Sequence, residues 1–186
     1  LGLSTGFMGD VGDDAEGNIL WRPDGVPICV GPSFPDSPRI VDDSVDGAII
    51  VWRGSSTYAQ RIDSKGNILW QEGGVELCKG GSSSIVSNGS GGAIIIFKYK
   101  KTETNERELR VQRIDTTGRT AWPDNGVVVF LDGESFSSVG SDDGCGGAIV
   151  SWATGKSLFK PKKSHVQRIS DEGNRLWGEK GVLLNP

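Results

Sequence analysis

The chain consists of short apolar runs, rich in β-branched residues, that are separated by clusters of glycine, aspartate, asparagine and serine. GAIIVWR, which begins at Gly47, and GGAIIIF, which begins at Gly91, are two such runs. Apolar runs of this length between turn-forming residues are typical of β-strands. No segment shows a sustained helical period. The pattern therefore predicts an all-β protein with many tight turns.

This pattern recurs along the chain. Tryptophan recurs at spacings of 49, 52 and 55 residues, at Trp21, Trp70, Trp122 and Trp177. Four residues before each tryptophan is a glycine, and four residues after each begins a Gly-Val pair. A second motif, DGAIIVW, GGAIIIF or GGAIVSW, occurs three times, as does Gln-Arg-Ile ten residues before the tryptophan. These shared registers indicate an internal repeat.

Each repeat unit contains four expected strands, typified by SPRIVDDS, GAIIVWR, YAQRID and NILW. SKGN and TTGR, between the third and fourth of these, suit hairpin turns in which glycine takes a positive φ. Four strands in about 50 residues is the size of one β-propeller blade. We therefore expect one repeat domain over 1–186, with units at about 22–70, 71–122 and 123–177 and partial units at both ends.

A β-trefoil is the alternative fold, because it also has three units of about this size. The tryptophan motif occurs four times, however, and a closed trefoil has no use for a fourth copy. The copy number favours about three blades, belonging either to a larger ring with further blades in the same chain or to a homo-oligomer. Repeat units depend on their neighbours to bury their faces.

The Asp-x-x-Gly-x-x-x-Trp segments that end at Trp21, Trp70 and Trp122 resemble the tryptophan-docking repeat of quinoprotein-like β-propellers. The wider pattern of GGAII-x-W, YAQRID, GN-x-LW and GV resembles a propeller-type repeat of large secreted bacterial proteins. The resemblance implies that each tryptophan packs between neighbouring blades. It carries over neither a quinone site nor a metal-ligand set, so we expect no cofactor and no bound metal.

Charge and composition argue against two classes of function, nucleic-acid binding and membrane spanning. The net charge is −4 and the isoelectric point is near 5.1, which argues against nucleic-acid binding. No apolar run approaches the roughly 20 residues of a membrane-spanning helix, so we expect no membrane span. The first residues lack the basic region of a signal peptide. For a secreted or cell-surface protein, the signal would lie outside this chain.

The recurring aromatic residues are expected to form the core rather than to stack on a ligand. They are Trp21, Trp70, Trp122, Trp177, Trp52, Phe97 and Trp152. The recurring arginines allow two interpretations. Arg61, Arg113 and Arg168 either stack on a tryptophan or pair with a turn aspartate, or they form a basic set that binds an anionic ligand.

Other candidates for chemistry are weaker. The acidic pairs Asp42–Asp43 and Asp142–Asp143 lack the spaced oxygens of a calcium loop and suit hairpin turns. His165 is the only histidine, and no G-x-S-x-G motif accompanies it, so a catalytic triad has no support. We expect the three cysteines to be free. Catalytic residues are therefore not assigned.

The units differ most between their second and third strands, where the last two contain longer loops. The third unit places four lysines and a phenylalanine there, at Lys156, Phe159, Lys160, Lys162 and Lys163. This loop is either a solvated hairpin or a contact surface for an acidic glycan or an acidic protein. We expect a non-catalytic binding or spacing module of a larger extracellular bacterial protein. The alternatives are a purely structural repeat and a fragment of a polysaccharide hydrolase or lyase whose active site needs further blades.

Overall fold

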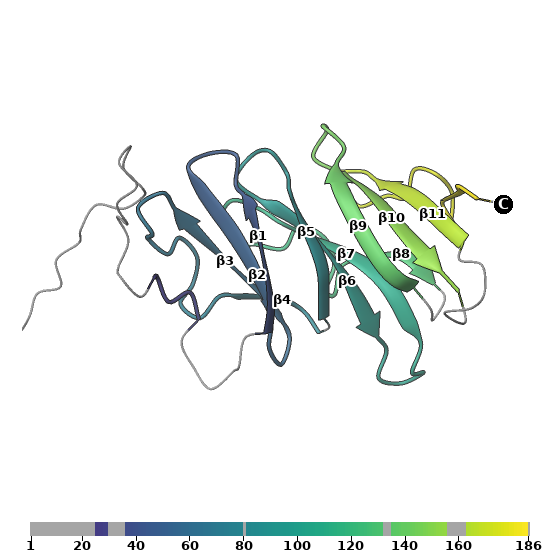
Figure 1. Cartoon of the computed structure of the whole chain (residues 1–186), viewed down its shortest axis with the longest axis horizontal. Helices are drawn as coiled ribbons and strands as arrows, with labels where there is room; N and C mark the ends of the chain where they lie inside the picture. The colour runs from purple at the N-terminus through teal and green to yellow at the C-terminus, as the bar shows by residue number, and fades with distance from the viewer. Residues whose placement is uncertain (1–24, 30–35, 80, 132–134, 156–162, 186) are drawn as a thin grey trace, which may run out of the picture.

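The fold is a row of three four-stranded antiparallel sheets, each built from four consecutive strands. The computed structural model describes residues 25–29, 36–79, 81–131, 135–155 and 163–185. These residues contain strands and turns and no helix. Figure 1 shows the sheets side by side along the long axis of the molecule, in chain order. We call the sheets blade 1, blade 2 and blade 3.

The strands within each blade follow one another in space as they do in sequence. Blade 1 contains β1 (Asp36–Asp42), β2 (Gly47–Arg53), β3 (Thr57–Asp63) and β4 (Val75–Cys78). Blade 2 contains β5 (Gly81–Ser87), β6 (Ala93–Lys100), β7 (Arg107–Ile114) and β8 (Val127–Leu131). Blade 3 contains β9 (Ser135–Asp142), β10 (Ala148–Thr154), β11 (Lys163–Ile169) and β12 (Val182–Leu183).

This arrangement confirms the expected all-β, propeller-like architecture of about three blades. The second strands β2, β6 and β10 occupy equivalent places in the three sheets, as the GGAII motif predicts. The trefoil alternative is not observed, since each sheet contains only strands that are consecutive in sequence.

The predicted position of the fourth strand was wrong. NILW, residues 67–70, forms only a single bridge between Ile62 and Ile68, and the fourth strand is Val75–Cys78, beyond the tryptophan. The backbone leaves the sheet after Leu69, whose N–H donates to the Arg61 carbonyl at 2.8 Å. Trp70 must reach the next blade, so its segment cannot continue the ladder. The same bridges recur at Ile114–Thr120 and Ile169–Arg175.

Two apolar layers fill the spaces between blades. Side chains alternate across each strand, so each blade has a forward face, toward the next blade, and a rear face. The forward face of blade 1 and the rear face of blade 2 form one cluster, which includes Ile49, Val51, Ala59, Ala93, Ile95, Phe97 and Ile114. The forward face of blade 2 meets the rear face of blade 3 in the same way, through Ile94, Ile96, Val111, Ala148, Val150, Trp152 and Ile169. The main apolar core therefore lies between the sheets.

A short segment covers part of the rear face of blade 1. Ile28 and Cys29 pack against Ile50, Trp52 and Ile62. In sequence, GVPIC at residues 25–29 matches GVELC at 74–78, the segment that contains β4. Residues 25–29 thus cover blade 1 as the end of blade 1 covers blade 2.

Candidate interaction surfaces

The recurring glutamine of the third strand hydrogen-bonds to the main chain of the tryptophan segment. Gln60 is fully buried. Its Oε1 accepts hydrogen bonds from the main-chain N–H of Arg61 at 2.9 Å and of Trp70 at 3.1 Å, and its Nε2 donates to the Gln71 carbonyl at 2.8 Å. Gln167 repeats this arrangement around Trp177. A buried side chain that satisfies three main-chain groups has a structural role.

Sequence reasoning assigned no role to this glutamine. Its signal was nonetheless present, because glutamine stands ten residues before the tryptophan in all three copies. An amide carries both a donor and an acceptor, which this position uses. Gln112 likewise accepts from the N–H of Arg113 at 2.9 Å and donates to the Pro123 carbonyl at 3.0 Å.

The recurring arginine connects a turn of its own blade to the next blade. Arg61 Nε donates to Asp43 Oδ2 at 2.7 Å, and its Nη1 donates to the Thr116 carbonyl of blade 2 at 3.4 Å. Arg168 repeats the pairing with Asp143 at 2.8 Å. The interpretation that these arginines pair with a turn aspartate is thus confirmed for Arg61 and Arg168.

Arg113 differs, because blade 2 has Asn88 where the other blades have Asp43 and Asp143. Its Nη1 donates to the Asp171 carbonyl of blade 3 at 3.1 Å. Its Nε is buried and has no hydrogen-bond partner among the described residues. The second copy therefore keeps the contact between blades but lacks the ion pair.

The aspartates of the β1–β2 and β9–β10 turns are occupied by their own turns. Asp43 Oδ1 accepts main-chain N–H groups from Val45, Asp46 and Gly47. Burial acts to raise the pKa of Asp43, but these hydrogen bonds and Arg61 outweigh it and hold that pKa below its usual value. Asp143 shows the same balance, with Arg168 as its partner. These carboxylates act as turn and ion-pair acceptors, and no metal-ligand cluster of three or more occurs in the described part of the chain.

The repeated tryptophan forms a wedge between blades, as the resemblance implied. Trp70 Nε1 donates to the Thr116 carbonyl at 3.0 Å, and Trp122 Nε1 donates to the Asp171 carbonyl at 2.9 Å. Each indole lies against a glycine of the next blade, Gly118 or Gly173. These glycines have φ of +85° and +87°, and an added Cβ would lie within 3.1 Å of the ring. Gly118 and Trp122 belong to one Gly-x-x-x-Trp segment but contact different neighbours. Gly118 lies against the preceding blade, and Trp122 binds the following one.

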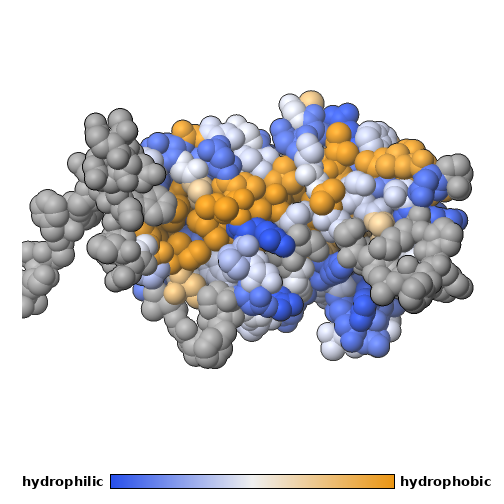
Figure 2. Space-filling view, viewed as in Figure 1, coloured by the Kyte–Doolittle hydropathy of each residue, from blue (hydrophilic) through white to orange (hydrophobic). Residues whose placement is uncertain are grey.

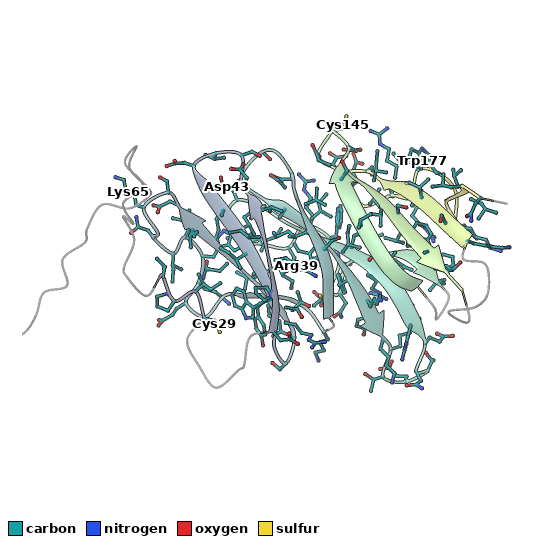
Figure 3. All side chains as sticks on the ribbon, in the orientation of Figure 1. Cys29, Arg39, Asp43, Lys65, Cys145 and Trp177 are labelled. Atoms are coloured by element: carbon teal, nitrogen blue, oxygen red, sulfur yellow. The ribbon has the colours of Figure 1, made fainter. Side chains whose placement is uncertain are left out.

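The other aromatic core positions are buried as expected. Trp52, Phe97 and Trp152 are at most 2 % exposed and lie on the rear faces of the three blades. Trp177, by contrast, is 38 % exposed. Figure 3 labels it at the C-terminal end of the row of blades. Trp21 lies outside the described residues.

His165 belongs to an aromatic stack on the rear face of blade 3. Its ring lies 5.4 Å from the Trp152 ring at an interplanar angle of 10° and 5.6 Å from the Phe130 ring. Burial, followed by the charge of Lys163, lowers the pKa of His165 below its ordinary value. Tyr58 stacks on Trp52 at the equivalent place in blade 1. This correspondence indicates a packing role for the histidine.

Several charged side chains of the second unit's long hairpin pair with one another. β6 and β7 form a hairpin in which Lys101 Nζ lies 2.9 Å from Glu108 Oε1 and 3.6 Å from Glu106 Oε2. Arg110 binds the buried Glu108 and lies over the Tyr99 ring at 4.5 Å. Burial acts to raise the pKa of Glu108, but Lys101 and Arg110 hold it below its usual value. These cations are therefore engaged within the fold.

The lysine-rich loop of the third unit joins β10 to β11. Lys156, Phe159, Lys160 and Lys162 lie outside the described residues. Lys163, the first residue of β11, is exposed. Its main chain pairs with Thr154 across the hairpin.

The three cysteines are free. Cys78 is buried in the layer between blades 1 and 2, and burial is the main cause that raises the pKa of its thiol to about 12. Cys145 lies exposed in the turn between β9 and β10, at the edge of the molecule where Asp43 also lies (Figure 3).

Comparison with known proteins identifies no relative: no family model, no curated protein and no solved structure matches the chain. Among the residues that the structure describes, there is no helix of the length and apolarity required to cross a bilayer.

Proposed function

We propose that this chain is a non-catalytic, propeller-type scaffold, acting as a binding or spacing module of a larger extracellular bacterial protein. The observation that supports the proposal is the use of the repeated polar side chains. The glutamines tie segments within a blade, and the arginines and tryptophans tie one blade to the next. Repetition in this protein thus serves architecture, and binding is left to the positions where the units differ.

The lysine-rich segment between β10 and β11 is the proposed contact surface. It adds a local positive charge to a chain of net charge −4. The comparable hairpin between β6 and β7 pairs Lys101 with Glu106 and Glu108, whereas the segment from Lys156 to Ser164 contains no acidic residue. The ligand we propose is an acidic glycan. Lysine provides adaptable contacts rather than the bidentate recognition that arginine supplies, so we expect weak binding.

Binding to a panel of acidic glycans at low and moderate salt tests this proposal. Changing Lys156, Lys160, Lys162 and Lys163 to serine should abolish most binding, and salt should weaken binding by the unmodified protein, since screening acts over about 8–10 Å at 0.1–0.15 M.

The control variant removes the same charge elsewhere. It changes four exposed lysines from other parts of the fold to serine, namely Lys65, Lys79, Lys100 and Lys180. This variant should bind as the unmodified protein does, apart from a small effect of net charge. Equal loss in both variants would point to net charge alone, and binding that ignores salt would contradict the proposed surface.

A further inference from the structure

The forward face of blade 3 contains the residues of an interface between blades, but they are exposed. Trp70 and Trp122 are 7 % and 5 % exposed, whereas Trp177 is 38 % exposed. Leu77 and Val129 are almost fully buried, whereas Leu184 at the same repeat position is 57 % exposed. Val139 and Val182 are also exposed on this face. Figure 2 shows apolar surface toward this end of the molecule.

The arginine of this face is held as it is in the interface between blades 1 and 2. Arg61 and Arg113 each donate to a carbonyl of the following blade. Arg168 is held by Asp143 in the same manner as Arg61 is held by Asp43. Within the described ranges, no carbonyl accepts from the Trp177 indole N–H. Arg168 is therefore held as Arg61 is, and the Trp177 indole lacks the carbonyl acceptor that the following blade supplies to Trp70 and Trp122.

The internal interfaces show what covers such a face. In blades 2 and 3 the rear face presents an alanine, a β-branched residue, an aromatic residue and an isoleucine; the two sets are Ala93, Ile95, Phe97, Ile114 and Ala148, Val150, Trp152, Ile169. Next to each set, a glycine turn lies against the tryptophan and offers the carbonyl that accepts its N–H. Both interfaces use the same chemistry.

We propose that the forward face of blade 3 binds the rear face of a further blade of this same repeat. The proposal deepens the scaffold function and rests on it, since it names the partner of the scaffold's open end. Ser151, which lies on this face where blade 2 has Ile96, already donates its hydroxyl to the His165 carbonyl at 3.0 Å. A docked blade that buries Ser151 therefore leaves no hydroxyl donor unsatisfied.

A second copy of the chain is a poorer occupant. Its first complete blade is blade 1, and the rear face of that blade is already covered in part by Ile28 and Cys29. These residues occupy the place that Leu77 and Cys78 occupy on blade 2. A second copy would have to displace them to dock. The fitting partner is a blade whose rear face is uncovered.

The test extends the chain by one blade. A copy of residues 80–131 is joined after Pro186, and hydrogen exchange of the Trp177 indole N–H is followed by ¹⁵N NMR, with the signal assigned through Trp177→Phe. Docking of the added blade should slow this exchange at least tenfold, toward the rate of the Trp122 indole. A second extension joins a copy of residues 132–186 instead. It presents the rear face of blade 3, which has Trp152 where blade 2 has Phe97.

The matched control is the first extension with Gly118→Val in the added copy. The side chain should collide with the indole, since a Cβ at Gly118 already lies 3.0 Å from Trp70, so Trp177 should exchange as fast as in the unextended chain. Fast exchange in both unmodified extensions overturns the proposal. So does a dimer of the unextended chain that dissociates on Leu184→Lys, because the occupant is then a second copy. Loss of glycan binding leaves this proposal untouched, so the two failures are distinguishable.

Discussion

The indole N–H of Trp70 donates to the main-chain carbonyl of Thr116 at 3.0 Å, so a residue of blade 1 is held by a turn of blade 2. The bond explains why the tryptophan and the glycine turn recur together. Neither contributes its full stabilisation within its own blade. Each blade is therefore stabilised mainly through its neighbours, as in other repeat proteins.

Removing a wedge should destabilise the protein strongly. We expect Trp70→Ala or Trp122→Ala to lower the free energy of unfolding by roughly 3–5 kcal/mol, the usual range for large-to-small core changes. Trp177→Ala is the comparison and should cost clearly less than either, because Trp177 is 38 % exposed whereas Trp70 and Trp122 are almost fully buried. Chemical denaturation of the three variants measures this, and a small effect at Trp70 would contradict the wedge.

Asn88→Asp should stabilise blade 2. The change gives the buried Nε of Arg113 the acceptor that Asp43 and Asp143 provide in the other blades. Because the hydrogen bond would involve two charged groups, we expect a gain of about 1 kcal/mol at neutral pH. The gain should vanish in the Arg113→Gln background. If Asn88→Asp stabilises both backgrounds equally, the ion pair is not its cause.

Protonation of His165 should make the fold less stable in mild acid. Its pKa in the folded protein lies below the ordinary value of 6.5, so the unfolded chain binds the proton more tightly. Stability from this residue is complete above about pH 6.5 and is lost as the pH falls through the lower, folded pKa. Unfolding measured at several pH values tests this. His165→Tyr, which copies Tyr58 of blade 1, should remove the pH dependence in this window.

The cysteines should differ in reactivity. Cys145 is exposed, so a disulfide reagent should modify it in the folded protein, whereas Cys78 should react only on unfolding because its pKa is raised to about 12. Thiol titration with and without denaturant measures the difference, and Cys145→Ser identifies the fast phase. Rapid modification of Cys78 in the native protein would show that the layer between blades 1 and 2 opens readily.

Much of the fold could be predicted from particular residues. The runs from Ala48, Ala93 and Ala148 were expected to be equivalent strands, and they are. The tryptophan wedge was also expected. The segment before Trp70 was wrongly predicted to be a strand, because its apolar residues match a strand locally while its tryptophan is directed to another blade.

The candidate surfaces were less predictable. Pairing of Arg61 with Asp43 was one of two interpretations, and a sequence separation of 18 positions gives no sign of contact. The role of Gln60 was missed although glutamine recurs ten residues before the tryptophan, because the main-chain groups that it binds come together only in the folded chain. The lysine-rich loop stays a prediction, since most of it lies outside the described residues.

The sequence by itself determined the β class, the repeat period and the strands that carry the apolar runs, because alternation and turn chemistry act over a few residues. Only the tertiary structure decided that Gly118 lies against Trp70 rather than Trp122, and that the last tryptophan is left exposed. These contacts join residues tens of positions apart. Their partners are set by the packing of whole sheets, which no local pattern records.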